Sequence, residues 1–224
     1  MHKTGSLVIV GDSAFAEVAF EYFMHQSTFD VVGFAVERAY LKRDSLFGKP
    51  VVAFEDIEQH FAPAQHWFYA ATVYTQLNRL RTRLYSATKA KGYRPASFVS
   101  PDARVWPNVQ FGEHCFVFEN NVIQPFVQIG DNVVLWSGNH IGHHARIGNN
   151  CFIASHVVIS GFSEIGDNVF IGVNATLGNN VTVGRDCLIG AGALVLKDVP
   201  EDKVVPGTAG DPGGSARRLN RVRE

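Results

Sequence analysis

The sequence lacks a surplus of charge of either sign. Lys and Arg number 20 and Asp and Glu number 21, so the formal net charge is -1 at pH 7. This balance argues against a nucleic-acid binder, which normally carries a basic surplus. Charged residues make up 18% of the chain and apolar residues 46%, which argues against intrinsic disorder.

Long hydrophobic runs are missing as well. No segment reaches the ~18 apolar residues that a membrane helix needs. Residues 1–5 lead directly into a strand-like segment instead of forming a signal peptide. From these absences we predict a soluble, cytoplasmic protein with neither a nucleic-acid nor a membrane partner.

Cysteine is scarce, with only Cys115, Cys151 and Cys187 in the chain. An odd number of cysteines in a chain without a secretory signal argues against a disulfide framework. The three residues follow one another at intervals of 36 residues, and this regular spacing indicates a repeat.

A repeat of six residues runs through almost half of the chain. Every sixth position from Val99 to Val195 holds Val, Ile, Leu or Phe without a break, often followed by Gly. A short strand can place one residue in six inward only if the chain turns a corner at every repeat. Three hexads, or 18 residues, then close one triangular coil, and the cysteines stack in alternate coils as buried thiols.

The first hundred residues follow a different pattern. Short apolar runs predict strands over 7–10, 31–36, 50–52 and 67–71, and residues 15–23 and 77–87 each show the apolar face of a helix. Strands that alternate with helices predict a small parallel sheet of Rossmann type. We expect a ligand crevice at the carboxyl ends of its strands, near Ser13, Glu37 and Thr72.

The turn after the first strand does not fit two familiar motifs. The dinucleotide fingerprint G-x-G-x-x-G would need Gly at position 13, where Ser stands, and Asp12 places a negative charge where the pyrophosphate would rest. The run from Gly11 to Phe15 also lacks the closing Gly of a nucleophile elbow. Both observations argue against NAD binding and against a hydrolase serine.

Three hexads carry a resemblance to a known family. The runs IGNNCF at 147–152, IGDNVF at 165–170 and VGRDCL at 183–188 look like those of the left-handed parallel β-helix acyltransferases. A Rossmann-like domain followed by such a β-helix resembles the sialic-acid O-acetyltransferase and sugar N-acetyltransferase family that includes the bacillosamine-pathway enzyme. The resemblance covers the whole chain. It implies an α/β Rossmann-like sugar-nucleotide-binding domain over 1–96, an all-β left-handed β-helix over 97–199 and a C-terminal tail over 200–224.

The resemblance implies an acetyl-CoA-dependent N-acetyltransferase that acts on a nucleotide-linked amino sugar used in surface glycan synthesis. It further implies a homotrimer with acetyl-CoA between neighbouring β-helices, and no metal. The family's acetyl-CoA contacts fall on Phe152, Val173 and Ala191, and His156 is expected to replace the histidine that the family has at position 152. The contacts to the sugar nucleotide fall on Ser13, Ala14, Phe15, Val36, Glu37 and Thr72, of which Phe15 either stacks a base or packs in the core.

Clustered histidines are the candidate catalytic residues. In the family, a histidine two residues after the hexad aliphatic is the general base, and a glutamate follows it. His143 matches the base, whereas His144 stands where the glutamate would be. Either His144 hydrogen-bonds His143 and fixes its tautomer, or an acid such as Glu119 or Glu164 reaches the base. Beside them, Asn139 and His140 are expected to contact the substrate.

A zinc enzyme is disfavoured, and two other functions remain as alternatives. The β-helix carbonic anhydrases bind zinc through three histidines, but their ligand spacing is not reproduced by His140, His143 and His144, so we predict no metal. The same fold and base would also serve an O-acetyltransferase that acts on a sialic acid or a polysaccharide hydroxyl. A trimeric scaffold without catalysis is the non-enzymatic alternative.

Overall fold

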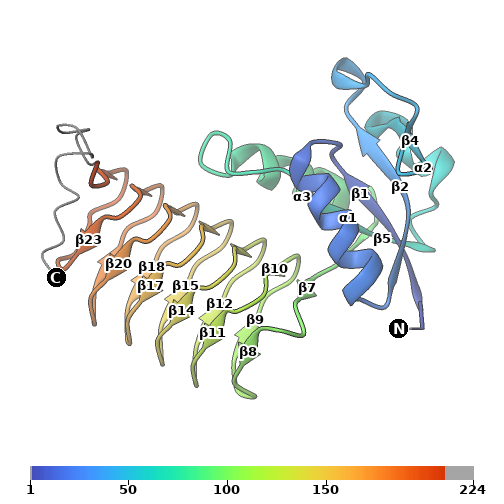
Figure 1. The fold of residues 1–224 in the computed structure, drawn as a ribbon. Coiled ribbons are helices and arrows are strands. Elements are labelled where there is room, and N and C mark those ends of the chain that lie inside the picture. The colour runs from blue at the N-terminus through green and yellow to red at the C-terminus, as the bar shows by residue number, and fades with distance from the viewer. Residues whose placement is uncertain (1, 210–224) are drawn as a thin grey trace, which may run out of the picture.

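The computed structural model describes residues 2–209, which form an N-terminal sheet domain and a long stack of triangular coils (Figure 1). The sheet domain lies against one end of the stack, and the coils extend away from it. Within the described residues, no helix is long and apolar enough to cross a membrane.

The N-terminal domain is built on a sheet with the strand order β3-β4-β2-β1-β5-β6. Its strands are parallel except for β3, which pairs with β4 in the antiparallel sense. From β1 the chain first builds β2, β3 and β4 on one side and then crosses over to build β5 and β6 on the other side. The strand order therefore reverses beside β1. The bounds are β1 (Gly5–Val10), β2 (Phe29–Val36), β3 (Ser45–Leu46), β4 (Lys49–Ala53), β5 (His66–Ala70) and β6 (Arg94–Pro95).

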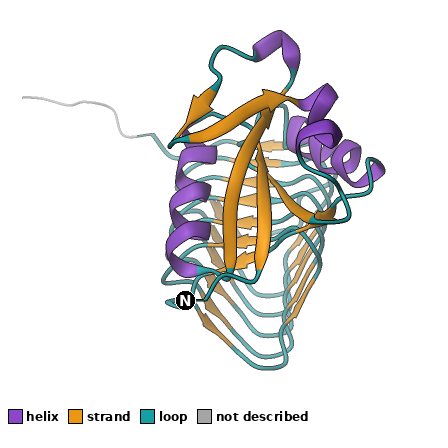
Figure 2. Ribbon diagram, turned by 90° about the vertical axis from the view of Figure 1, so that its right-hand side faces the viewer, coloured by secondary structure: helices purple, strands orange, loops and turns teal. Residues whose placement is uncertain are grey.

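Helices cover both faces of this sheet (Figure 2). Phe15, Ala19 and Phe23 of α1 pack on the face that also meets the coils, which explains their apolar spacing along one side of the helix. On the opposite face, Ile57 of α2 and Leu84 of α3 pack against the sheet. The helices are α1 (Ala14–Gln26), α2 (Ile57–His60) and α3 (Arg79–Ala90), with short 3₁₀ turns η1 (Arg38–Tyr40) and η2 (Phe54–Asp56).

The coils form three parallel sheets, and we number their faces in chain order. Each strand pairs with the strand one coil later, as Ile123 does with Ile141. The first face holds β7 (Phe98–Val99), β10 (Phe116–Val117), β13 (Val134–Leu135), β16 (Phe152–Ile153), β19 (Phe170–Ile171), β22 (Leu188–Ile189) and β24 (Val204–Val205). The second face holds β8 (Arg104–Val105), β11 (Val122–Ile123), β14 (His140–Ile141), β17 (Val158–Ile159), β20 (Thr176–Leu177) and β23 (Leu194–Val195). The third face holds β9 (Gln110–Phe111), β12 (Gln128–Ile129), β15 (Arg146–Ile147), β18 (Glu164–Ile165) and β21 (Thr182–Val183).

The repeated aliphatic residues fill the interior of the coils, as the six-residue pattern predicts. Ile141, Ile159 and Leu177 are fully buried in one continuous apolar core. The free cysteines Cys115 and Cys151 lie in the same core, and burial raises the pKa of Cys151 to about 12, so its thiol is inert at neutral pH. Parallel sheets together with hexapeptide repeats fit a left-handed β-helix.

One boundary expected from the sequence is wrong. The repeat was expected to end at residue 199, but β24 adds one more strand to the first face, paired with β22. The hexad spacing is lost at Pro200, but the coil continues. Val204 and Val205 still form backbone pairs with Leu188 and Ile189 although they are out of step with the hexads. The rest of the expected tail, residues 210–224, lies outside the described residues.

A shared apolar core joins the two parts. The ring of Phe15 contacts Phe116 of the first face, at a centroid distance of 5.8 Å, and Tyr69 contacts the same ring at 5.2 Å. The fully buried Arg81 of α3 crosses the junction and donates to the carbonyl oxygens of Asn132 (2.9 Å) and Cys151 (3.1 Å). The sheet domain is therefore fixed against the first face.

Candidate functional site

His143 and His144 lie on a corner of the stack, between the second and third faces. We call this the second corner, and the corner between the first and second faces the first corner. Both histidines are exposed. The backbone N–H of His143 donates to Oε1 of Gln124 (2.8 Å), and that of His144 donates to the Pro125 carbonyl (3.1 Å), both one coil earlier. Bonds between coils therefore fix the backbone beneath both imidazoles.

The two imidazole rings face each other through the same kind of nitrogen. Nδ1 of His143 lies 3.2 Å from Nδ1 of His144, with the rings at 87°. The His143 ring leans over the next coil at Gly161, where an added Cβ would lie 2.9 Å from its Cε1 atom. The absence of a side chain at Gly161 therefore gives this ring its place.

Neither carboxylate considered from the sequence reaches His143 within the chain. Glu119 lies on the first corner, where Tyr22 (2.6 Å) and Ser137 (2.6 Å) donate to its two oxygens. Glu164 points outward from the third face. His144 is thus the side chain that contacts Nδ1 of His143.

Asn139 does not reach a substrate, which corrects the expectation from the sequence. Its side chain is 1% exposed and points into the coil, where Nδ2 donates to the Trp136 carbonyl (2.6 Å) and Oδ1 accepts from the Val157 N–H (2.8 Å). The amide satisfies backbone groups of the coil itself. His140 is half-buried on the second face, between Val122 and Val158 of the neighbouring strands.

Three of the four residues expected to contact acetyl-CoA share one edge of the stack. His156, Val173 and Ala191 are exposed on successive coils of the first corner. The exception is Phe152, which is 4% exposed on the first face and stacks between Trp136 and Phe170. The expectation for Phe152 is therefore wrong, because the first face is covered by the N-terminal domain.

The carboxyl ends of the N-terminal strands border a cavity of about 400 Å³. Glu37 stands in its wall and accepts two hydrogen bonds from Arg83, at 2.7 Å and 2.9 Å. This hydrogen-bonded partner holds the pKa of the Glu37 carboxyl below its usual range. The lining residues are Val10, Gly11, Asp12, Ser13, Ala35, Val36, Glu37, Tyr40, Thr72, Val73, Thr75, Leu80, Arg83 and Leu84.

This cavity contains some of the residues expected to bind a sugar nucleotide and leaves out others. Ser13, Val36, Glu37 and Thr72 line it, whereas Ala14 does not. Phe15 is 2% exposed in the core between the two domains, so its ring packs there and cannot stack a base.

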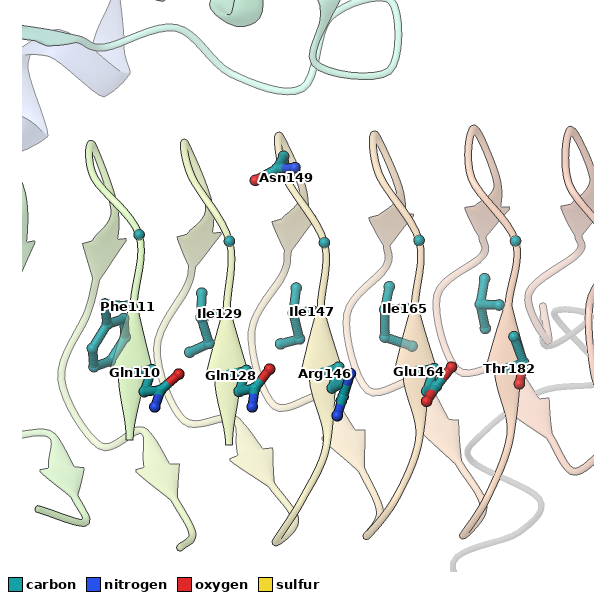
Figure 3. Close-up of a pocket in the computed structure, with 16 residues that line it drawn as sticks. Gln110, Phe111, Gln128, Ile129, Arg146, Ile147, Asn149, Glu164, Ile165 and Thr182 are labelled. Carbon is teal, nitrogen blue, oxygen red and sulfur yellow. The ribbon is translucent and has the colours of Figure 1, made fainter. Parts of the chain in front are cut away.

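A second, shallower cavity of about 580 Å³ lies along the third face. Outward side chains follow one another across five strands there (Figure 3). None of them is a histidine or a cysteine, and the sequence reasoning did not single out this face. These side chains are Gln110, Gln128, Arg146, Glu164 and Thr182.

Sequence reasoning missed the neighbours of the histidine pair. The rings of Phe126 and Phe162 stack on the two faces of His144, at centroid distances of 4.6 Å and 4.8 Å. The signal was present, because positions 126, 144 and 162 are each 18 residues apart, one coil.

As for metals, residues 2–209 contain no group of three or more His, Cys, Asp or Glu side chains placed to hold an ion.

The bacterial transferase hexapeptide family, described as six repeats, matches residues 126–161 and 162–197. No curated protein sequence matches the chain.

Solved structures match the chain over both domains. The acetyltransferase domain of PglB from Neisseria gonorrhoeae is 25% identical, with a TM-score of 0.82 over 91% of this chain and 97% of that domain. PerB from Caulobacter crescentus, in complex with CoA and GDP-perosamine, is also 25% identical, with a TM-score of 0.80 over 91% of this chain and 94% of its own. WeeI from Acinetobacter baumannii shares the fold at 21% identity, with a TM-score of 0.51 over 91% of this chain and 97% of its own.

Proposed function

We propose that this chain moves an acetyl group from acetyl-CoA to the amino group of a nucleotide-linked amino sugar, a function supported by its match to the bacterial hexapeptide transferase family over residues 126–197 and by its similarity to an acetyltransferase domain. The observation that carries the proposal is the similarity to PerB, which holds CoA and a nucleotide-linked amino sugar and matches both domains of this chain. The coils alone would support an acyltransferase. The matched N-terminal domain, with its cavity at the strand ends, supports the nucleotide-linked acceptor.

His143 is the proposed general base. Its imidazole is exposed on the second corner, its backbone is fixed by Gln124, and an imidazole nitrogen is a common general base in enzymes. The amine nitrogen bonds to the acetyl carbon and the carbon–sulfur bond breaks, while the amine proton passes to Nε2 of His143. Backbone N–H groups at the corners are the proposed donors to the oxyanion.

We propose that Ser13, Val36, Glu37 and Thr72 hold the nucleotide part of the acceptor, because they line one cavity at the strand ends. In the same way, His156, Val173 and Ala191 are the proposed contacts to acetyl-CoA, because they form one exposed edge.

The active assembly is a proposed homotrimer. Each strand of the second face runs from the first corner to the second corner, so the acetyl-CoA residues and His143 lie on opposite edges of that face. One chain does not bring the two edges together. A neighbouring β-helix would bring its first corner to His143, which supports a site built between subunits.

The test of the function is thiol release from acetyl-CoA by the purified protein. The acceptors are UDP-, GDP- and dTDP-linked amino sugars, with matched sugars that carry a hydroxyl in place of the amine. We expect release with at least one amino sugar and a fall of ~10²-fold or more in the His143→Ala variant. The absence of release with every amino sugar contradicts the proposal, and release with the hydroxyl sugars alone indicates O-acetylation.

A further inference from the structure

Each corner of the coil places one residue in the left-handed conformation, and Asn, Asp or Gly occupies most of these positions. Three successive coils of the second corner depart from this rule. Phe126, His144 and Phe162 hold the position with φ of 67°, 60° and 59°. Histidine tolerates this region, but phenylalanine is disfavoured there, and such strain persists where function requires it. The column is therefore a feature that the fold alone does not explain.

The rings of this column are stacked face to face. The His144 ring lies at 26° to that of Phe126 and at 17° to that of Phe162. Phe126 is 55% exposed and Phe162 is 50% exposed, so hydrophobic burial within one chain does not account for them. A cation between two aromatic faces is stabilised by their negative quadrupoles. Positive charge that passes to the His144 ring during the reaction would therefore meet two stabilising aromatic faces.

The contact between His143 and His144 constrains the hydrogens. Two ring nitrogens at 3.2 Å need one hydrogen between them. When that hydrogen is on Nδ1 of neutral His143, its Nε2 atom is bare and accepts a proton. When it is on Nδ1 of neutral His144, Nε2 of His143 already carries a hydrogen. His143 therefore acts as a base only if His144 is the acceptor.

We propose that His144, held between Phe126 and Phe162, positions His143 and takes over its proton in place of a carboxylate. This inference rests on the proposed function. As the amine nitrogen bonds to the acetyl carbon and the carbon–sulfur bond breaks, the amine proton goes to Nε2 of His143. The hydrogen on Nδ1 of His143 then passes to Nδ1 of His144, which releases its Nε2 hydrogen to solvent. The CoA thiolate takes a proton from water.

In the described part of the chain, no other charged group near the two imidazoles takes the role proposed for Phe126, His144 and Phe162. Within residues 2–209, no carboxylate forms a hydrogen bond or an ion pair with either imidazole. Gln124 contacts the backbone of His143 with its side-chain oxygen. The charged residues on the neighbouring strands of the third face are Arg146 and Glu164, which point outward. The two phenyl rings are thus the groups that stabilise charge on His144.

The first test locates the hydrogen without using turnover. Nitrogen-15 NMR of the full chain, with histidine labelled and both rings neutral, distinguishes a protonated from a bare ring nitrogen. We expect Nδ1 of His143 to carry the hydrogen and Nδ1 of His144 to be bare. The reverse pattern overturns the inference whether or not the protein is an acetyltransferase.

The second test measures the phenyl rings with a double-mutant cycle. Phe126→Asn and Phe162→Asn remove the rings and supply a residue that tolerates the left-handed conformation. We expect each to lower kcat by about two- to fivefold with little change in KM, while the melting temperature stays the same or rises. In the His144→Glu background a carboxylate accepts the hydrogen, so the same substitutions should change kcat less than about twofold.

Phe47→Leu is the matched control, because Phe47 is 47% exposed and lies in the N-terminal domain. It should leave kcat unchanged. An equal loss from the Phe→Asn substitutions in both backgrounds would mean that the rings act on the substrate or on the fold. No loss in either background would mean that they do nothing. Either result overturns the inference, and wild-type thiol release separately decides the proposed function.

Discussion

At the residue scale, the position of the His143 ring depends on the absence of a side chain at Gly161 on the next coil. The sequence analysis did not single out Gly161, and only the structure places the His143 ring above it. The location of His143 on a corner could be predicted from the repeat, because it stands two residues after the inward Ile141. The sequence left two partners open for this imidazole, His144 or a distant carboxylate, and only the side-chain positions in the structure select His144.

Gly161→Ala should displace the His143 ring. A Cβ at this position would lie 2.9 Å from Cε1 of His143, and its φ is not left-handed, so the backbone accepts Ala. We expect a fall in turnover of roughly tenfold or more with an unchanged melting temperature, because small misplacements of a base are costly. Thiol release and thermal unfolding measure the two effects.

Gly178→Ala is the control on the next coil, where the added Cβ meets the flexible end of Leu196 at 3.2 Å. Its turnover should match that of the wild type. If Gly161→Ala is equally active, the ring does not need the place that the structure assigns to it.

His114 is a buried residue with a pH-dependent contribution to stability. It is enclosed at the junction, where Nε2 accepts from the Ala70 N–H (2.8 Å). Desolvation, opposed by a hydrogen bond to Asn132, lowers its pKa to about 3. Between that value and the unfolded pKa near ~6.5, the unfolded chain binds one more proton than the folded chain. Stability is therefore lost as the pH falls below ~6.5, at about 1.4 kcal/mol per pH unit.

Urea unfolding at one protein concentration, between pH 6.5 and pH 5.5, measures this slope. Carboxylates contribute roughly least to the slope in this pH range. In His114→Gln the free energy of unfolding should be lower, and its fall between pH 6.5 and pH 5.5 should be smaller than in the wild type by about 1 kcal/mol. A slope equal to that of the wild type would show that His114 does not carry it.

At the scale of elements, the hexads predict which residues face inward, because a coil that turns every six residues leaves one large inward position per strand. Asn139 shows the limit of this reasoning. Its inward position was visible, but its use by the backbone of two coils was not. Phe152 failed for a related reason, since the hexad cannot tell which of three faces is covered by another domain. The extra strand β24 was missed because its spacing differs from six.

The junction between α3 and the first face depends on Arg81. Arg81→Ala should lower the free energy of unfolding by about 3 kcal/mol, because two buried carbonyl oxygens lose a charged donor and a cavity remains. Arg79→Ala on the same helix breaks only an exposed ion pair with Asp186 (3.1 Å) and should cost less than about 1 kcal/mol. Equal losses in the two variants, measured by denaturant unfolding, would contradict this assignment.

At the scale of the whole molecule, the order of a parallel sheet domain before a stack of coils could be predicted from two periodicities in one chain. The docking of the domain on the first face could not, because it rests on aromatic contacts between residues far apart in sequence, such as Phe15 and Phe116. The proposed trimer can be predicted neither from the periodicities nor from the contacts within one chain, since it depends on surfaces that are exposed in a single chain.

Mixed assemblies test whether the site is built between subunits. His143→Ala removes the base, and Val173→Arg blocks the exposed acetyl-CoA edge, so each variant alone should be inactive. In random trimers of the two, about one site in four joins an intact base to an intact edge, and about a quarter of wild-type activity should return. Without recovery in assemblies shown to be mixed, the base and the acetyl-CoA edge belong to one subunit.

The mass of the acceptor after incubation with acetyl-CoA tests the proposed reaction most directly. We expect the wild-type protein to add one acetyl group to a nucleotide-linked amino sugar, through an amide that resists hydroxylamine, and His143→Ala to do so at least ~10²-fold more slowly. An acceptor that gains no acetyl group, or a His143→Ala variant that acetylates at the wild-type rate, would contradict the proposal.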